Sequence, residues 1–369
     1  TDTDTDTDTD TDTDPDPTCD LADEPVVDVE DRSTWPIGDT FLACVDYPDG
    51  ASFEDCPDLS TLSAEYHLEN AWGGTPWNDS FCWWTAIATC GPEAARPDSC
   101  CYIIEDLDYL CATPGRPFRV DGKARVAQSG TAQDWSTQTT LSLDDLSRAS
   151  RRKLIQHWTA AGHAEHASIA SFSRFASQLL ALGAPAGLVA EATRAMADEI
   201  NHARLCFGIA SAAAGTQISI GGIDISGSLD AVTPEQMLVD TIEEGCINET
   251  ICAALAEDAL EQTTDPEIHA ALQQIADDES RHATLAWKTV RWLLETHPEL
   301  TELAQRTFSE ATLRPTPACS MAEDGALATH GIPAMEEEQK VAARALREVV
   351  IPCASALLQK EANSEGAVA

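Results

Sequence analysis

Apolar side chains recur at helical spacing from residue 142 onwards. In the first of these segments, positions 165, 169, 172, 176 and 179 form one stripe three to four residues apart, as on the buried face of a helix. Gly, Pro and capping residues mark the segment ends. The pattern predicts helices over residues 143–182, 186–213, 233–263, 264–296, 299–313 and 335–359.

The connections between these helices indicate how they pack. Residues 214–233 form a long Gly/Ser/Ile loop suited to a crossover between two helix pairs. Pro352 is expected to kink or interrupt the last helix. The predicted fold class is mainly α, with a four-helix bundle over residues 142–297, a long helix 2–3 crossover, and extra C-terminal helices in residues 298–369.

Two predicted helices carry nearly the same ten residues, MADEINHARL at 196–205 and ADDESRHATL at 276–285. Each holds a Glu-x-x-His pair, which puts a carboxylate and an imidazole on one helix face about one turn apart. Two such helices, each partnered by a helix with one more inward Glu, supply the six ligands of a di-iron carboxylate bundle. The predicted ligands are Glu165, Glu199, His202, Glu249, Glu279 and His282.

The ligand on the third helix has a rival in Glu244. The interval from Glu244 to Glu279 is 35 residues, closer to the 34 residues between Glu165 and Glu199 than the 30 residues from Glu249. We prefer Glu249 because several core-forming residues share its helix face: Ile242, Cys246, Cys252 and Ala253.

The ligand set predicts two iron ions as cofactor, with manganese as an alternative. Four ionised Glu residues balance two ferrous ions, and mixed Glu/His ligation suits iron or manganese better than a closed zinc site. Asp198 and Asp278 can each accept a hydrogen bond from a ligand imidazole, and Arg281 can pair with such an Asp. Asn201 replaces this Arg in the first repeat, so the two ions are expected in unequal surroundings.

The other histidines and cysteines near the ligands have simpler explanations. His163 and His166 flank Glu165 but point away from the helix face that carries it. They are therefore expected either at the surface or in contact with the outer side of the ligands. Three cysteines are interpreted as small core residues, with a redox role or a Cys–Cys bond near the metal as the alternative: Cys206, Cys246 and Cys252. A bridge between Cys319 and Cys353 is also considered.

The first 141 residues differ in character. Residues 1–14 are seven Thr-Asp repeats, so residues 1–18 are predicted to form a disordered stalk. Residues 19–120 are predicted to form a small irregular module held by disulfides, and residues 121–141 a linker. The Trp residues of the module at 19–120 are expected to pack inside it, but they could instead bind a glycan or a partner. The disulfide candidates lack any Cys-x-x-Cys zinc pattern: Cys19, Cys44, Cys56, Cys82, Cys90, Cys100, Cys101 and Cys111.

The net charge and the cysteine content limit the cellular locations and the binding partners that are expected for the chain. The net charge is −41, which disfavours binding to nucleic acid and to anionic membranes because both need clustered Lys and Arg. The cysteines predict an oxidising compartment: a secreted, periplasmic or surface protein. No apolar run approaches the ~20 residues of a membrane span, and no signal peptide is visible. The chain begins at Thr1 rather than Met, which suggests a processed or a trimmed form. Thr/Asp tracts of this kind in bacteria often follow a lipid-modified Cys, so the tract predicts such an anchor upstream of Thr1, with an inert leader as the alternative.

The site residues resemble the ferritin-like superfamily of di-iron carboxylate proteins. DESRH at 278–282 is similar to the Asp-Glu-x-Arg-His pattern of bacterial di-iron oxygenases, and DEINH at 198–202 departs from it only at Asn201. EHASIASF from Glu165 and EGCINET from Glu244 resemble secreted bacterial ferritin-like proteins with a Cys-rich leader, as does GRPFRVDG from Gly115. The resemblance covers residues 142–297 well and the leader only loosely.

This resemblance implies an exported oxidoreductase that uses O2 or peroxide. The chain lacks the Cys-x-x-Cys pair of a rubredoxin-type iron centre, so such an enzyme needs an external electron donor. Two alternatives stay open, namely ferroxidase or iron handling at the cell envelope, and a non-enzymatic surface protein on a ferritin-like scaffold. A homo-oligomer or a cell-surface partner is compatible with each.

Overall fold

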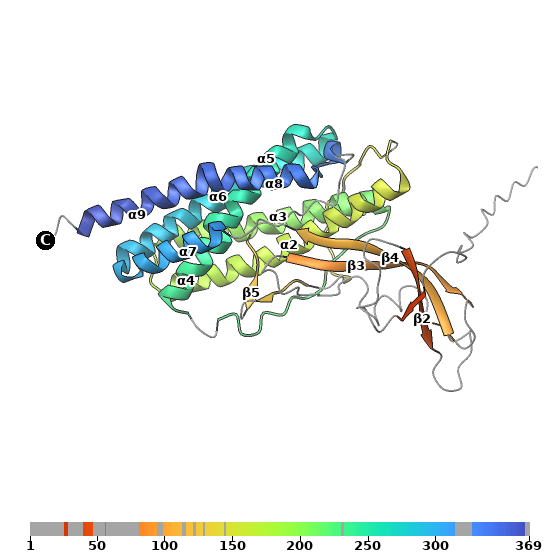
Figure 1. The fold of residues 1–369 in the computed structure, drawn as a ribbon, viewed down its shortest axis with the longest axis horizontal. Helices are drawn as coiled ribbons and strands as arrows, with labels where there is room; N and C mark the ends of the chain where they lie inside the picture. Colours follow the sequence, from red (N-terminus) through yellow and green to blue (C-terminus); the bar gives the residue numbers. More distant parts are fainter. Residues whose placement is uncertain are drawn as a thin grey trace, which may run out of the picture. The chain divides into compact units, whose positions relative to one another are not determined.

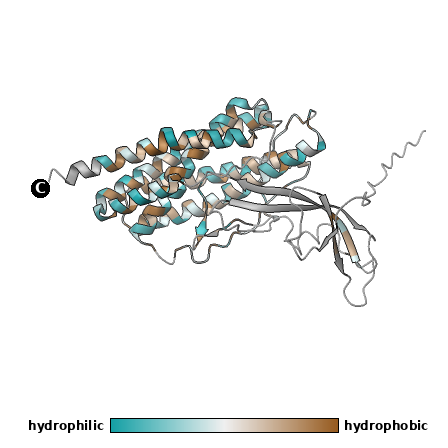
Figure 2. Ribbon diagram, viewed as in Figure 1, coloured by the Kyte–Doolittle hydropathy of each residue, from teal (hydrophilic) through white to brown (hydrophobic). Residues whose placement is uncertain are grey.

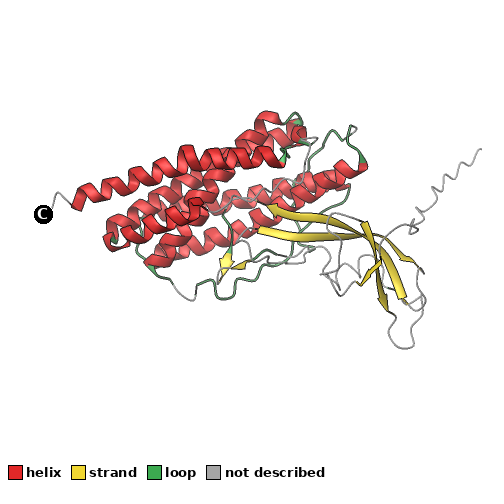
Figure 3. Ribbon diagram, viewed as in Figure 1, coloured by secondary structure: helices red, strands yellow, loops and turns green. Residues whose placement is uncertain are grey.

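The computed structural model shows a mainly helical protein with a β-sheet in its N-terminal part (Figures 1 and 3). Two compact units are present, one of residues 1–71 and 84–108, the other of residues 72–83 and 109–369. The structure describes residues 26–28, 40–46, 56, 81–93, 99–112, 116–120, 123–127, 130–143, 145–229, 232–313 and 327–365. The predicted stalk at residues 1–18 lies outside these ranges.

The N-terminal module contains a four-stranded sheet in the order β1-β2-β4-β3, so the expectation of an irregular module was wrong. Strand β1 pairs parallel with β2, and β2 pairs antiparallel with β4. Aromatic and β-branched residues favour the strands, but the many Cys and Pro residues concealed this signal. The strands are β1 (Val26–Asp28), β2 (Thr40–Asp46), β3 (Phe81–Glu93) and β4 (Ser99–Ala112).

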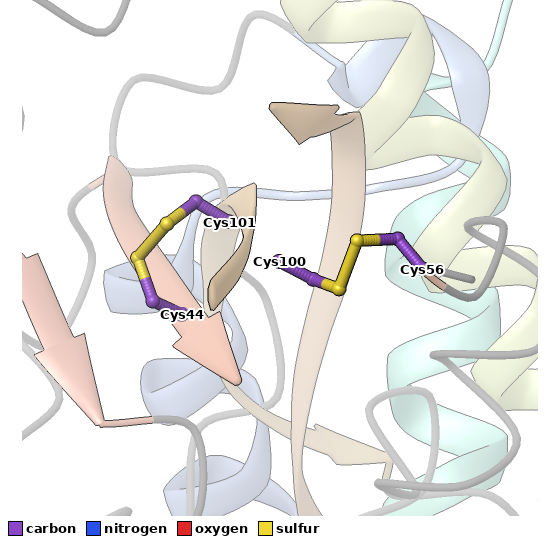
Figure 4. The surroundings of a disulfide bond; sticks show 4 residues. All are labelled: Cys44, Cys56, Cys100 and Cys101. Carbon is purple, nitrogen blue, oxygen red and sulfur yellow. A yellow bond between two sulfur atoms is a disulfide. The ribbon is translucent and has the colours of Figure 1, made fainter. Parts of the chain in front are cut away.

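Two disulfides fasten strand β4, as Figure 4 shows. Cys44 lies opposite Cys101 in the β2–β4 register and is bonded to it, whereas Cys100 is bonded to Cys56. Successive strand residues point to opposite faces, so the two bonds leave β4 on opposite sides. Two disulfides indicate an oxidising, extracellular environment. The other four candidates have no described side chains: Cys19, Cys82, Cys90 and Cys111.

Four long helical stretches build the second unit, and they match the predicted helices within a few residues. The first, second and fourth are α2 (Arg148–Ala181), α3 (Ala186–Ala214) and α6 (Pro266–Thr296). The third consists of α4 (Pro234–Asp240), a π-helical segment η4 (Thr241–Glu249) and α5 (Thr250–Gln262). Side-chain caps set the starts, since Ser147, Thr233 and Asp265 accept hydrogen bonds from backbone N–H groups of the following turn.

The packing of these helices places polar residues between two apolar clusters. Helix α2 packs against α3, η4 and α5 pack against α6, and α3 packs against α6. One cluster includes Ala195 of α3 and Leu285 of α6, and the other includes Cys206 and Ala276 of the same two helices. The apolar faces of these helices are visible in Figure 2. Residues 199–202 and 279–282 therefore lie in the gap between the clusters.

The C-terminal part covers the outside of these helices. A short 3-10 turn, η5 (Pro298–Leu300), leads into α7 (Thr301–Leu313), and η6 (Ala328–His330) precedes α8 (Met335–Ala345). The π-helical segment η7 (Leu346–Val350) then joins α8 to α9 (Ile351–Glu365). Pro352 was expected to kink or interrupt this stretch, but the chain stays helical and the irregularity takes the form of the π turn just before the proline.

The segment before α2, predicted in part as a linker, packs on the helical unit. Strands β5 (Arg119–Val120) and β6 (Lys123–Ala124) form a short hairpin. The carbonyl of Ala127 accepts a hydrogen bond from His163 Nδ1 at 2.9 Å, and the amide of Thr137 donates to the carbonyl of Arg204 at 3.0 Å. Among the described residues, no helix combines the length and apolarity that a membrane crossing requires.

Candidate metal centre

The six predicted ligands meet inside the helical unit, and all are buried. They form two groups of four, within each of which the nearest donor atoms lie within 4.8 Å of one another. The first group is Glu165, Glu199, His202 and Glu279, and the second is Glu199, Glu249, Glu279 and His282. Glu199 and Glu279 belong to both groups, so each can bridge two metal ions.

The distances around each imidazole show how the groups are built. His202 Nδ1 lies 3.7 Å from Glu165, 3.5 Å from Glu199 and 3.4 Å from Glu279. His282 Nδ1 lies 3.2 Å from Glu199, 3.9 Å from Glu249 and 3.6 Å from Glu279. Each group therefore has one imidazole, one carboxylate of its own and two shared carboxylates.

Behind the imidazoles, two aspartates are arranged crosswise. His202 Nε2 lies 3.0 Å from Asp278, and His282 Nε2 lies 3.3 Å from Asp198, so each Asp serves the histidine of the other helix. Donation from Nε2 directs the lone pair of Nδ1 towards the carboxylates. Arg281 pairs with both aspartates. One Arg therefore contacts the aspartates on both sides, although the first repeat has Asn201 at the corresponding position.

The donor atoms themselves lack partners, and this tests whether a metal fits. Seven carboxylate oxygens and the Nδ1 atoms of both histidines are buried without a hydrogen bond. Buried polar atoms are nearly always satisfied, and leaving them unpaired costs about 1–3 kcal/mol each. Metal coordination would satisfy these atoms together. The cluster could hold metal ions, and its mixed oxygen and nitrogen donors suit iron or manganese.

Burial and mutual charge shift the pKa values of the cluster residues in opposite directions. Burial raises the pKa of Glu165 and of Glu249 well above the ordinary value, and neighbouring carboxylates add to this effect. Burial acts in the same direction on Glu199 and Glu279, but the nearby ligand imidazoles, and for Glu279 also the Glu249 carboxyl, leave their pKa values lowered. Both imidazoles have pKa values well above the ordinary value, since their carboxylate partners outweigh burial.

Glu244, the rival to Glu249, takes no part in the cluster. Its carboxylate is buried with two guanidinium groups: Arg174 Nη2 lies 3.0 Å from both oxygens, and Arg116 Nε lies 3.5 Å from one. The Ser171 hydroxyl donates to the same carboxylate at 3.2 Å. Neither arginine was predicted from the sequence: Arg116 comes from outside the helices and leaves no periodic signal, and Arg174 lies on α2, where a single Arg is typical of a solvent-facing position.

The remaining histidines and cysteines also lie outside the two groups. His163 is buried, and burial lowers its pKa to about 4. His166 packs edge-on against Trp135 at 4.7 Å between ring centroids, with its pKa also lowered to about 4 by burial. Cys206 and Cys246 are buried thiols, and burial raises their pKa values well above the ordinary value. Cys252 is buried too.

Two further features are an exposed cysteine in the C-terminal part and a cavity next to His282. Cys353 is an exposed free thiol, and Cys319 lies outside the described residues. A cavity of about 240 Å³ opens between α3 and α6 and reaches the back of His282 beside Asp198. This cavity ends behind the imidazole and not at the carboxylate side of the cluster.

Comparison of the chain with protein-family models, with curated proteins and with solved structures returned no match. Its class therefore follows from fold and site alone. The chain is a mainly helical protein with a disulfide-bearing N-terminal module and a buried Glu/His cluster that could hold metal ions.

Proposed function

We propose that the chain is a ferritin-like di-iron carboxylate protein, with manganese as the alternative to iron. The observation that carries the proposal is the pair of four-residue groups that share Glu199 and Glu279. A Glu from each of two helices and a Glu-x-x-His pair from each of the other two is the ligand arrangement of carboxylate-bridged bundles. The helical unit would then be a ferritin-like four-helix bundle of α2, α3, η4 with α5, and α6.

The charge of the cluster supports two divalent ions. Four ionised carboxylates carry four negative charges, which two divalent ions balance while both imidazoles stay neutral. Without metal, four buried carboxylates repel each other and must take up protons. The absence of thiolate ligands in the two groups disfavours a structural zinc site.

The reaction class we favour is an O2- or peroxide-dependent oxidation in an exported protein. When bound, two ferrous ions supply two electrons to O2 or peroxide, one from each ion, and an external donor must return them. Glu199 and Glu279 would hold both ions, whereas Asp198 and Asp278 would orient the imidazoles through their hydrogen bonds. The apolar clusters on either side of the ligands exclude water from the centre. Export is supported by the two disulfides of the N-terminal module.

Metal analysis of the full chain tests this proposal. Purified protein is loaded anaerobically with ferrous iron or Mn²⁺, desalted and assayed for metal, and the ferrous form is then mixed with O2 or peroxide while its absorption is followed. We expect two ions per chain and an absorption change on oxidation. Glu279→Gln should abolish both, whereas Glu295→Gln, an exposed position on the same helix, should change neither.

Three outcomes would contradict all or part of the proposal. A wild-type chain that retains neither iron nor manganese is not a di-metal protein. Uptake far above two ions per chain, with assembly into a large particle, would instead favour iron storage. Two bound ions without any oxidation by O2 or peroxide would refute the reaction class but leave the metal centre intact.

A further inference from the structure

The largest fully buried side chain described in the structure is an arginine from outside the helices. Arg116 precedes strand β5, is only 2% exposed, and lies in the helical unit. Its guanidinium carbon lies 4.0 Å from the ring centroid of Phe175 and 5.3 Å from that of Phe172. The Phe172 ring in turn packs against the imidazole of His282 at 5.0 Å. Arg116 is therefore separated from a metal ligand by one aromatic ring.

The partner of Arg116 is the carboxylate of Glu244, which it shares with Arg174. Arg174 binds both oxygens of Glu244 and also donates to the backbone carbonyl of Arg119. The segment that runs into strand β5 thus contributes two groups to the surroundings of Glu244 and Arg174: the Arg116 guanidinium pairs with Glu244, and the Arg119 carbonyl accepts from Arg174. Burial lowers the pKa of Arg116, but the carboxylates of Glu244 and Glu249 oppose this shift. Asp240 also interacts electrostatically with both guanidinium groups, so the two positive charges are surrounded by several carboxylates.

The local geometry of η4 explains why Glu244 is held this firmly. In a regular α-helix, residues five apart point about 140° away from each other, since each residue turns the helix by about 100°. A π-helix closes its hydrogen bonds between residues five apart, which brings such residues to neighbouring positions. Glu244 and Glu249 lie at this spacing in η4, and both are buried. The π segment thus allows Glu249 to face His282 while Glu244 faces the arginines.

Gly245 makes the close approach of this segment possible. A Cβ atom at Gly245 would lie 2.5 Å from the Cβ of Ala286 on α6 and 3.3 Å from Arg116 Nη1. Glycine therefore lets η4 pack directly against α6 and against the inserted guanidinium. The π segment, the glycine and the buried Arg form one arrangement next to the second ligand group.

We propose that Arg116 is a positioning residue for the metal position formed by Glu249 and His282. Together with Arg174, it holds Glu244 and thereby maintains the π segment that presents Glu249 to the metal. The first position depends on Glu165 of the regular helix α2 and does not need this arrangement. This inference rests on the proposed metal centre, because it concerns the occupancy of one of its two positions.

Arg116→Met tests the inference in the full chain. The substitution leaves Glu244 paired with Arg174, so no buried charge loses its only partner. We expect one Mn²⁺ ion to bind as in the wild type and the second to bind at least ~10-fold more weakly, the usual loss when a group that orients a ligand is removed. The spectroscopic signature is electron paramagnetic resonance at two equivalents of Mn²⁺, where the wild type should give the spectrum of a coupled pair and the variant that of single ions.

The direction of the change in affinity for the second ion distinguishes a positioning role of Arg116 from a purely electrostatic one. Removing a nearby positive charge strengthens cation binding by Coulomb's law. Weaker binding of the second ion therefore reports lost positioning, whereas equal or tighter binding would overturn the inference. Arg125→Met is the matched control, because Arg125 belongs to the same segment but pairs with the exposed Asp224; it should bind two ions like the wild type.

Two further results keep the inference separate from the proposal on which it rests. If the wild type binds no metal, the metal centre itself fails. If Arg116→Met does not fold, as judged by circular dichroism, Arg116→Lys takes its place under the same criterion, since lysine keeps the charge but lacks the planar fork. A weakened second ion in Arg116→Lys supports positioning, and an unchanged second ion refutes it.

Discussion

Metal loading should exchange about four protons for two divalent ions. In the metal-free cluster, the raised pKa values of Glu165 and Glu249 keep these carboxyls protonated, and both ligand imidazoles are protonated as well. Glu199 and Glu279 stay ionised, so two negative and two positive charges cancel. In the loaded cluster, four carboxylates balance two divalent ions around neutral imidazoles. The difference is two carboxyl protons plus two imidazolium protons, about four in all.

The sign and size of the pH dependence follow from this exchange. Protons compete with the metal, so affinity must rise with pH as long as the carboxyls and imidazoles are protonated in the metal-free protein. Each released proton contributes about 1.4 kcal/mol per pH unit, so four protons give about 5 kcal/mol per unit for the pair of ions. The dependence levels off above the raised pKa values, where the metal-free cluster has already lost its protons.

Isothermal titration calorimetry with Mn²⁺ measures the exchange directly. Titrations at one pH in three buffers of different ionisation enthalpy give the number of protons released per bound pair. A release of fewer than two protons, or an affinity that does not change with pH, would refute the protonation pattern derived from the buried cluster. Glu295→Gln, on an exposed position of α6, should release the same number as the wild type.

Three other perturbations have defined outcomes. Above about pH 6.5, where histidines with lowered pKa values such as His163 and His166 are neutral in both the folded and the unfolded state, the metal-free protein should lose thermal stability as pH rises, and the loaded protein should not. Raised pKa values such as those of Glu165 and Glu249 stabilise the fold only while the groups are protonated, so calorimetric melting curves at several pH values measure this difference. Asp198→Ala should weaken metal binding about 10–100-fold by releasing an imidazole, as measured by competition with a chelator. Gly245→Ala should lower the free energy of unfolding by about 1–3 kcal/mol, since its Cβ would clash with Ala286, and denaturant titration measures this loss.

The helices and the six ligands could be predicted from the sequence because both depend on local rules. Apolar stripes at helical spacing and capping residues such as Ser147 and Asp265 define the helices without reference to distant parts of the chain. The Glu-x-x-His pairs place their side chains on one face by helix geometry alone. The crossed pairing of Asp198 and Asp278 required the structure, because it depends on how α3 and α6 face each other.

The π segment and the buried arginine could not be predicted, for reasons that are not local. Residues 241–249 have no composition that distinguishes a π-helix from an α-helix, and an α-helical reading puts Glu244 and Glu249 on different faces. The choice between the two carboxylates depended on neighbouring apolar residues, and the structure places Glu249 with the ligands. Arg116 lies in a Gly/Pro-rich stretch that is typical of a surface connector, so its burial depends on contacts with Glu244 and Phe175.

The two four-residue groups of the cluster differ in more than the repeat implied. Asn201 in place of an Arg suggested unequal surroundings behind the imidazoles, yet Arg281 reaches both aspartates. A further difference lies at Glu165 and Glu249, the carboxylates that belong to one group each. Glu165 comes from an uninterrupted α-helix, whereas Glu249 ends a π segment whose Glu244 pairs with Arg116 from outside the helices. A ligand held by its own helix is preorganised, so if the cluster holds metal as proposed, a change of ligation is expected at Glu249 before Glu165.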